Sequence, residues 1–131
     1  MSNVLSETFL RYDRVKAAKA SFFIKDIEFV VRPAATKAYA NSVTKPPKDR
    51  KDEDGYYEEC VAKHLLVEVK NLLNDDKSPF ESNETNHIKL VKDYVGIGNK
   101  ILAFASDPGN FVESNKVDEE LGNSESSPSG K

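Results

Sequence analysis

The segment YYEECVAKHLLVEVKNLLN, residues 56–74, is the most apolar part of the chain. Its apolar residues recur at spacings of three and four, the period of an α-helix: Tyr57, Val61, Leu65, Val69, Leu72 and Leu73. Leu66 and Val67 widen the stripe on the same side. The spacing therefore predicts one long helix over residues 56–74, and so wide an apolar face should be buried by more than one neighbour.

Two shorter helices are predicted after this segment, near residues 88–95 and 97–105. For the first, Ser82 is a candidate N-cap and Gly96 a candidate C-terminal stop, around the apolar residues Ile88, Leu90, Val91, Tyr94 and Val95. The second offers Ile101, Leu102 and Phe104 to the core. Residues 107–109, Asp-Pro-Gly, are typical of a turn, after which Phe111 can still dock.

The N-terminal third changes period along its length. Ser6 followed by Glu7 resembles a helix start, and Phe9, Tyr12 and Val15 form a narrow stripe, which predicts a basic helix reaching residue 20. In SFFIKDIEFVVRP, residues 21–33, apolar residues alternate on both sides of Lys-Asp, which predicts an antiparallel β-hairpin with a two-residue turn. Pro33 suits the first turn of a following helix around Tyr39 and Val43.

Two segments lack the apolar residues needed to pack. TKPPKDRKDEDG, residues 44–55, is dominated by charge and is predicted to be a mobile surface loop. Residues 113–131 are rich in Ser, Asn, Gly and acidic residues and are predicted to be a disordered acidic tail. The sequence thus predicts an α+β fold, a mostly helical single domain over residues 1–112 with one small β-hairpin near the N-terminus.

Length and charge agree with one domain that binds partners. At 131 residues the chain can build a single core but not two of ordinary size. Residues 1–51 carry 11 Lys and Arg against 5 Asp and Glu, a net charge of +6, whereas residues 52–131 carry a net charge of −9. This asymmetry favours head-to-tail self-association or an acidic partner for the N-terminal part, and a solvated mixed surface is the ordinary alternative.

The composition points to a reducing compartment. Cys60 is the single cysteine and cannot form an internal disulfide. The polar start MSNVLSETF has no apolar core of a secretory signal, and no run is long enough to span a membrane. We therefore expect a cytoplasmic protein that makes no membrane contact.

No residue pattern indicates catalysis or metal binding. Cys60, His64 and Glu68 stand four apart and would stack on one face of the predicted long helix, but zinc needs a fourth ligand, and His87 is the only other histidine. The same thiol and imidazole lack an orienting group and an oxyanion hole, so a nucleophile is not expected either. We expect a half-buried thiol, a histidine at the solvent edge, and no catalytic, cofactor-binding or metal-binding residues.

Three further motifs have structural explanations. Gly96-Ile97-Gly98 resembles a dinucleotide fingerprint but follows no predicted strand, and the third glycine is replaced by Ile101, so a turn between helices is expected. Residues 83–85, Asn-Glu-Thr, match a glycosylation acceptor without a secretory signal. The basic cluster formed by Lys45, Lys48, Arg50 and Lys51 is neutralised by neighbouring acids, so nucleic-acid binding is not expected there. The predicted basic N-terminal helix is the better candidate for nucleic acid, and an ordinary solvated or partner-facing helix is its alternative.

The order of the elements resembles a known family. The hairpin carries Val31-Arg32-Pro33, and the apolar segment is followed by Asp75-Asp76, Pro79-Phe80, Ser82, Glu84 and Asn86, then by two short helices and Asn110-Phe111. This succession, over residues 5–112, resembles the tail assembly chaperones of long-tailed (siphovirus-type) bacteriophages. The chain differs from the family pattern in having Glu81 between Phe80 and Ser82 and in lacking a tryptophan.

The resemblance implies a binding function rather than an enzymatic one. Proteins of this family bind the tape measure protein, a very long helical chain, and hold it in solution in the host cytoplasm until tail tube subunits polymerise around it. A longer product of ribosomal frameshifting often recruits the tail tube protein. The alternatives are another phage tail or head-tail joining structural protein, or a small regulatory binding module. On the chaperone interpretation the candidate apolar anchors are Phe9, Tyr12, Phe22 and Phe29, each of which could instead close the core.

Overall fold

The structure is a computed structural model that describes residues 4–50 and 53–115. Its helices are α1 (Leu5–Thr8), α2 (Lys37–Thr44), α3 (Tyr56–His64), α4 (Glu84–Asp93) and α5 (Ile97–Ala105), with 3-10 turns η1 (Tyr12–Arg14) and η2 (Pro108–Phe111). Its strands are β1 (Ala20–Ile24), β2 (Ile27–Val31) and β3 (Leu66–Lys70). The predicted α+β class, with more helix than strand, is confirmed.

The strands form one antiparallel sheet in the order β1-β2-β3. The predicted hairpin is confirmed, and Lys25 adopts φ 56° at its two-residue turn. Phe22 pairs with Phe29, and Phe29 with Val69, so these three side chains share one face of the sheet. Rings of Phe22 and Phe29 stack at 5.2 Å, and Phe22 lies 5.2 Å from Phe104 of α5, so this face packs on α5.

The long helix predicted over residues 56–74 is wrong. The helix ends at His64, Leu65 is fully buried at the break, and β3 then pairs with β2. In β3 the β-branched Val67 and Val69 alternate with Glu68 and Lys70, a pattern that suits a strand. The hairpin alone would leave the inner edge of β2 unpaired, and pairing with β3 satisfies those backbone groups.

The single helix predicted over residues 6–20 is also wrong. The chain forms only α1 and η1, separated by extended residues at Phe9 and Arg11. The side chain of Asn115 holds this break: its Nδ2 donates to the carbonyls of Ser6 and Phe9 at 2.9 Å each, and its Oδ1 accepts from Arg11 N at 3.1 Å. We call residues 4–19 the N-terminal arm.

Asn115 belongs to the segment predicted to be a disordered tail. Its side chain is only 2% exposed, so the described fold continues at least to this residue. The remainder of the predicted tail, residues 116–131, lies outside the described residues. Part of the charged loop, residues 51–52, also lies outside them.

Removing this amide should loosen the N-terminal arm. In Asn115→Ala the carbonyls of Ser6 and Phe9 and the Arg11 amide lose three hydrogen bonds, each of which contributes about 0.5–1.5 kcal/mol. We expect amide hydrogens near residues 6–12 to exchange roughly tenfold faster or more, measured by hydrogen exchange with mass spectrometry. Ser114→Ala is the control, because Ser114 makes only longer bonds to Lys19, of 3.3 and 3.4 Å. Equal exchange in wild type and Asn115→Ala would contradict this role.

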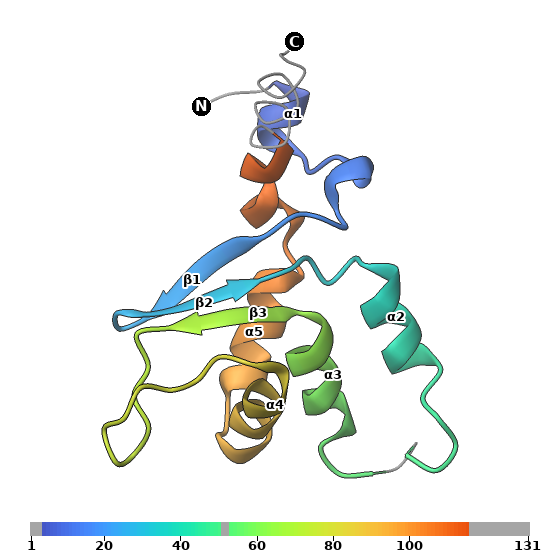
Figure 1. Ribbon diagram of the computed structural model, residues 1–131. Coiled ribbons are helices and arrows are strands. Elements are labelled where there is room, and N and C mark those ends of the chain that lie inside the picture. Colours follow the sequence, from blue (N-terminus) through green and yellow to red (C-terminus); the bar gives the residue numbers. More distant parts are fainter. Residues whose placement is uncertain (1–3, 51–52, 116–131) are drawn as a thin grey trace, which may run out of the picture.

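The core lies between the sheet and the helices α3, α4 and α5 (Figure 1). Its fully buried members include Val31, Leu65, Ile101 and Phe111, so the predicted docking of Phe111 is confirmed. α2 stands to one side and buries no residue; it begins at Lys37, later than the proline-led start that was predicted. Figure 1 also shows the N-terminal arm beside the end of the described chain.

Two predicted helix ends need correction. The N-cap of α4 is Asn83 rather than Ser82, and its side chain accepts a hydrogen bond from Asn86 N at 2.9 Å. α4 already ends at Asp93 with Tyr94 as its C-cap, so Gly96 lies two residues beyond that cap and is the N-cap of α5, with φ 92°. A left-handed backbone at this position favours glycine and makes the tight turn between α4 and α5.

Candidate functional site

A groove with an apolar floor lies where α4 meets the segment after β3, with a cavity volume of about 550 Å³. We call it the apolar groove. Its apolar lining is Leu72, Leu73, Phe80, Leu90, Tyr94 and Ile97. Polar residues complete it: Asn74, Asp75, Asn86, Lys89 and Asp93.

Each wall of the groove follows from local sequence. Asn86, Leu90 and Tyr94 stand four apart, so α4 and its C-cap present them along one side. The opposite wall is a turn in which Phe80 N donates to Leu72 O at 2.9 Å and Asn74 N donates to Ser78 O at 2.8 Å.

The tip of that turn is closed by a carboxylate. Asp76 Oδ1 accepts from Ser78 N at 3.0 Å and from Ser78 Oγ at 2.5 Å. These donors hold the pKa of Asp76 below its ordinary value. The wall is therefore a formed hairpin-like turn.

Large apolar side chains remain exposed at this corner of the molecule. Leu73 is 58% exposed and Tyr94 52% exposed, and both line the groove. Val95, next in sequence to Tyr94, is fully exposed. Adjacent exposed apolar side chains beside an apolar groove are typical of a protein-binding surface.

His87 packs against Phe80, one of the residues that line the groove. Ser82 Oγ accepts from Val69 N at 3.0 Å and lies 2.6 Å from His87 Nε2, so one hydroxyl joins β3 to α4. The imidazole stacks on the Phe80 ring, with centroids 6.5 Å apart, and is 3% exposed. Burial lowers the pKa of His87, against weaker opposing effects of Glu68 and Glu84.

The buried imidazole should make stability depend on pH. A histidine whose pKa is lowered in the folded state contributes stability that is complete above its ordinary pKa near 6.5 and is lost as pH falls below that value. Between pH 7.5 and 5.5 we expect His87 to remove up to about 1.4 kcal/mol from the free energy of unfolding, measured by urea denaturation. His87→Gln should lose this part of the dependence.

The pH test has an internal comparison. His64 also has its pKa lowered, mainly by burial and then by Lys63, so His64→Gln removes a second contribution and should leave that of His87 in place. A His87→Gln variant with the full wild-type pH dependence would contradict the assignment to His87.

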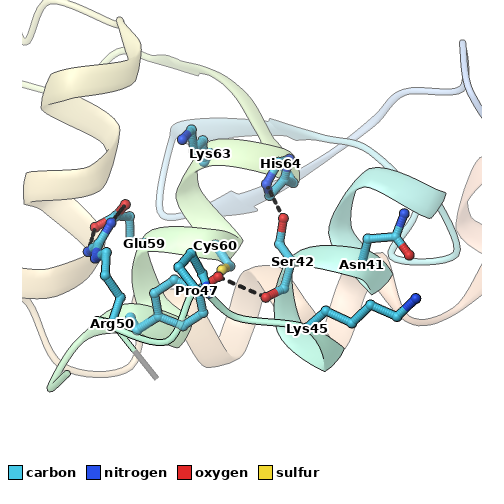
Figure 2. A pocket seen from close by; sticks show the side chains of 10 residues that line it. Asn41, Ser42, Lys45, Pro47, Arg50, Glu59, Cys60, Lys63 and His64 are labelled. Carbon is cyan, nitrogen blue, oxygen red and sulfur yellow. Dashed lines mark hydrogen bonds and ion pairs between the residues drawn. The ribbon is translucent and has the colours of Figure 1, made fainter. Parts of the chain in front are cut away.

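A second, polar cavity of about 490 Å³ lies between α2 and α3 (Figure 2). Tyr56 OH donates to Ser42 O at 2.8 Å, and Ser42 Oγ lies 2.8 Å from His64 Nε2. On the other side Arg50 binds both carboxylate oxygens of Glu59, at 2.8 and 2.5 Å, and also pairs with Glu53. Arg50 thereby ties the charged loop to α3 and lowers the pKa of Glu59.

The serine and histidine in this cavity are not arranged as a nucleophile and its base. The Ser42 hydroxyl donates its only hydrogen to Ala38 O at 2.9 Å, so it must accept from His64 Nε2. A general base would have to accept that hydrogen instead. In the described part of the chain, no hydrogen-bond partner orients the other ring nitrogen of His64. The Cys60 thiol beside them is 4% exposed, so it is buried rather than half-buried as predicted.

The predicted stack of Cys60, His64 and Glu68 does not form. The first two lie on α3, but Glu68 lies on β3 and is exposed, because the chain changes from helix to strand between them. Across residues 4–50 and 53–115, no three His, Cys, Asp or Glu side chains are placed to hold a metal ion. Gly96 lies in the predicted turn between helices, but Gly98, which was predicted to lie there too, is inside α5.

The candidate apolar anchors fall into two groups. Phe29 is 2% exposed and Phe22 packs between Phe29 and Phe104, so both close the core. Phe9 is 64% exposed and Tyr12 95% exposed, so the N-terminal arm does carry exposed aromatic side chains. The basic cluster is partly neutralised, since Arg50 is paired with two glutamates.

The comparisons with known proteins found no match: no family model, no curated protein and no solved structure is similar to this chain. Among the described residues, no helix has the length and apolar character required to cross a lipid bilayer.

Proposed function

We propose that this chain is a non-catalytic tail assembly chaperone of a long-tailed bacteriophage, which binds the tape measure protein and holds it in solution until the tail tube polymerises. The order of motifs over residues 5–112 supports the family. The host cell cytoplasm is the compartment in which such a protein acts.

The apolar groove is the observation that carries this proposal. A long helical partner presents repeated apolar stripes, and each stripe can place side chains against Leu73, Tyr94 and Val95. Burial of apolar area stabilises a complex by about 25 cal/mol per Å², and association has its own entropic cost. A contact limited to these few side chains therefore binds only weakly by itself. Many copies bound along one partner would together keep it in solution. Each copy, bound weakly, could still dissociate separately.

Self-association belongs to the same proposal. The basic N-terminal part and the acidic remainder favour contacts between copies that line up on the partner. A longer frameshifted product, if the gene encodes one, would bring the tail tube protein to the assembly.

Co-expression tests the proposal. The longest predicted coiled-coil reading frame of the same genome is expressed alone and together with this chain, and the partner is followed in the supernatant after centrifugation. We expect the partner to be insoluble alone and soluble together with this chain. A partner that stays insoluble in both cases contradicts the proposal, and finding the chain in purified phage particles would favour a structural component instead.

A further inference from the structure

The rim of the apolar groove carries more negative than positive charge. Asp75 and Asp93 contribute two carboxylates, and Lys89 contributes one ammonium group. Neither carboxylate has a hydrogen bond or an ion pair within residues 4–50 and 53–115. The groove thus combines an apolar floor, exposed Leu73 and Tyr94, and two carboxylates that form no ion pair among the described residues.

The backbone around the groove disfavours an extended partner. Strand addition needs a row of unpaired N–H and C=O groups. On the turn wall, Leu72 O and Phe80 N already pair with each other, Asn74 N pairs with Ser78 O, and Leu73 bridges Pro79. The other wall is α4, whose backbone groups pair within the helix.

The groove therefore offers side chains rather than a strand edge. Leu90 and Tyr94 rise along it at the spacing of a helical ridge, with Ile97 beyond them. Ridges of this kind accept the side chains of a second helix.

We infer that the apolar groove binds an amphipathic helix whose apolar stripe is bordered by lysine or arginine. A leucine-sized side chain enters the groove, and the neighbouring cations meet Asp75 and Asp93. This inference rests on the proposed function, which makes the apolar groove the binding site for a helical partner. It adds which charges border the apolar stripe of the bound segment. A helix bordered by acidic residues would instead meet like charge at the rim.

Two synthetic peptides test this inference. Both carry the same leucine stripe on a stapled helix with a fluorescent label; one has lysine at the flanking positions and the other has glutamate. Each exposed charge pair strengthens binding by a small factor, so two pairs favour the lysine peptide by roughly tenfold in Kd at low salt. Fluorescence anisotropy measures both affinities, and the preference should shrink as salt is raised.

Matched variants test whether the preference for the lysine peptide comes from the two rim carboxylates. Asp75→Asn together with Asp93→Asn should reduce the preference to within about threefold, because the rim charge is gone. Glu7→Gln together with Glu58→Gln removes the same charge from exposed positions on α1 and α3 and should keep the preference. Leu73→Ser should weaken both peptides. Circular dichroism establishes that each variant is folded.

The outcomes separate the inference from the proposed function. Equal affinity for the two peptides, a preference for the glutamate peptide, or a preference unchanged in Asp75→Asn with Asp93→Asn would overturn the inference even if the tape measure protein is kept in solution. Absence of binding to either peptide, including through self-association that covers the groove, would overturn it too. A preference that behaves as expected supports the inference even if co-expression fails.

Discussion

A Phe111→Ala variant is expected to lose about 3–5 kcal/mol of the free energy of unfolding, the usual cost of removing a buried phenyl ring. Phe111 is fully buried, and its ring lies edge-on to Phe104 at 5.7 Å, at the point where η2 closes the core against α5. The loss combines the transfer of the ring to water with the cavity that remains. For a domain of this size it corresponds to a drop in Tm on the order of 15 °C.

Thermal and urea denaturation followed by circular dichroism measure this loss. Phe111→Leu is the matched control, because it retains apolar volume and should cost clearly less than the alanine variant. A loss below about 1 kcal/mol for Phe111→Ala would contradict the position of η2 in the core.

Replacing Leu73 and Tyr94 together by serine is expected to reduce capture of the tape measure protein at least tenfold without unfolding the domain. Both side chains are more than half exposed, so the fold depends little on them, whereas the proposed contact depends on both. Truncating an anchor at the centre of an interface typically costs 2 kcal/mol or more, and a loss of 1.4 kcal/mol is already tenfold. Capture is measured as partner recovered with the tagged chain from co-expressing cells.

Two comparisons make this result specific to the groove. Phe23→Ser removes an equally exposed aromatic side chain, 60% exposed, from the opposite face of the sheet and should leave capture unchanged. Phe9→Ser with Tyr12→Ser removes the exposed aromatics of the N-terminal arm. If this arm variant loses capture while Leu73→Ser with Tyr94→Ser retains it, the binding surface is the arm and the assignment to the groove is wrong.

Elements set by local pattern could be predicted from the sequence. The hairpin required only alternation on both sides of Lys25-Asp26, and α5 required only the apolar spacing after Gly96. Both agree with the structure to within a residue or two, because neighbours along the chain supply most of their constraints.

Elements set by distant pairing could not be predicted in the same way. Residues 66–70 fit a helical stripe and a strand about equally well, since Val67 and Val69 alternate with Glu68 and Lys70 and also continue the apolar side of α3. These residues form a strand because they pair with the edge of β2 that the hairpin leaves unpaired. The alternation of Val67 and Val69 with Glu68 and Lys70 is the sequence signal for the strand, and the three- and four-residue spacing competes with it.

The N-terminal arm shows the same dependence on tertiary contacts. Its helical stripe of Phe9, Tyr12 and Val15 is real in sequence, but Asn115, about a hundred residues away, binds the carbonyl of Phe9 and the amide of Arg11. These bonds favour the extended link between α1 and η1. A hydrogen bond over this separation leaves no periodic signal.

The groove itself was missed for a related reason. The apolar spacing predicts Leu72 and Leu73 on a buried helical face and places Tyr94 and Val95 in the next helix. The break at Leu65 redirects the chain, so that Leu73 ends on a turn facing α4 and remains exposed. The sequence signal that could have indicated this is the Asn-Asp-Asp-Lys-Ser-Pro turn at residues 74–79, which brings the chain back on itself.

Size-exclusion chromatography with light scattering on the co-expressed pair tests the central proposal most directly. The measured mass gives the number of copies of this chain bound to one tape measure protein. The proposal predicts one complex that holds many copies per partner, and a smaller mass or loss of the complex for Leu73→Ser with Tyr94→Ser. A chain that elutes alone as a monomer, with the partner lost to the insoluble fraction, would contradict it.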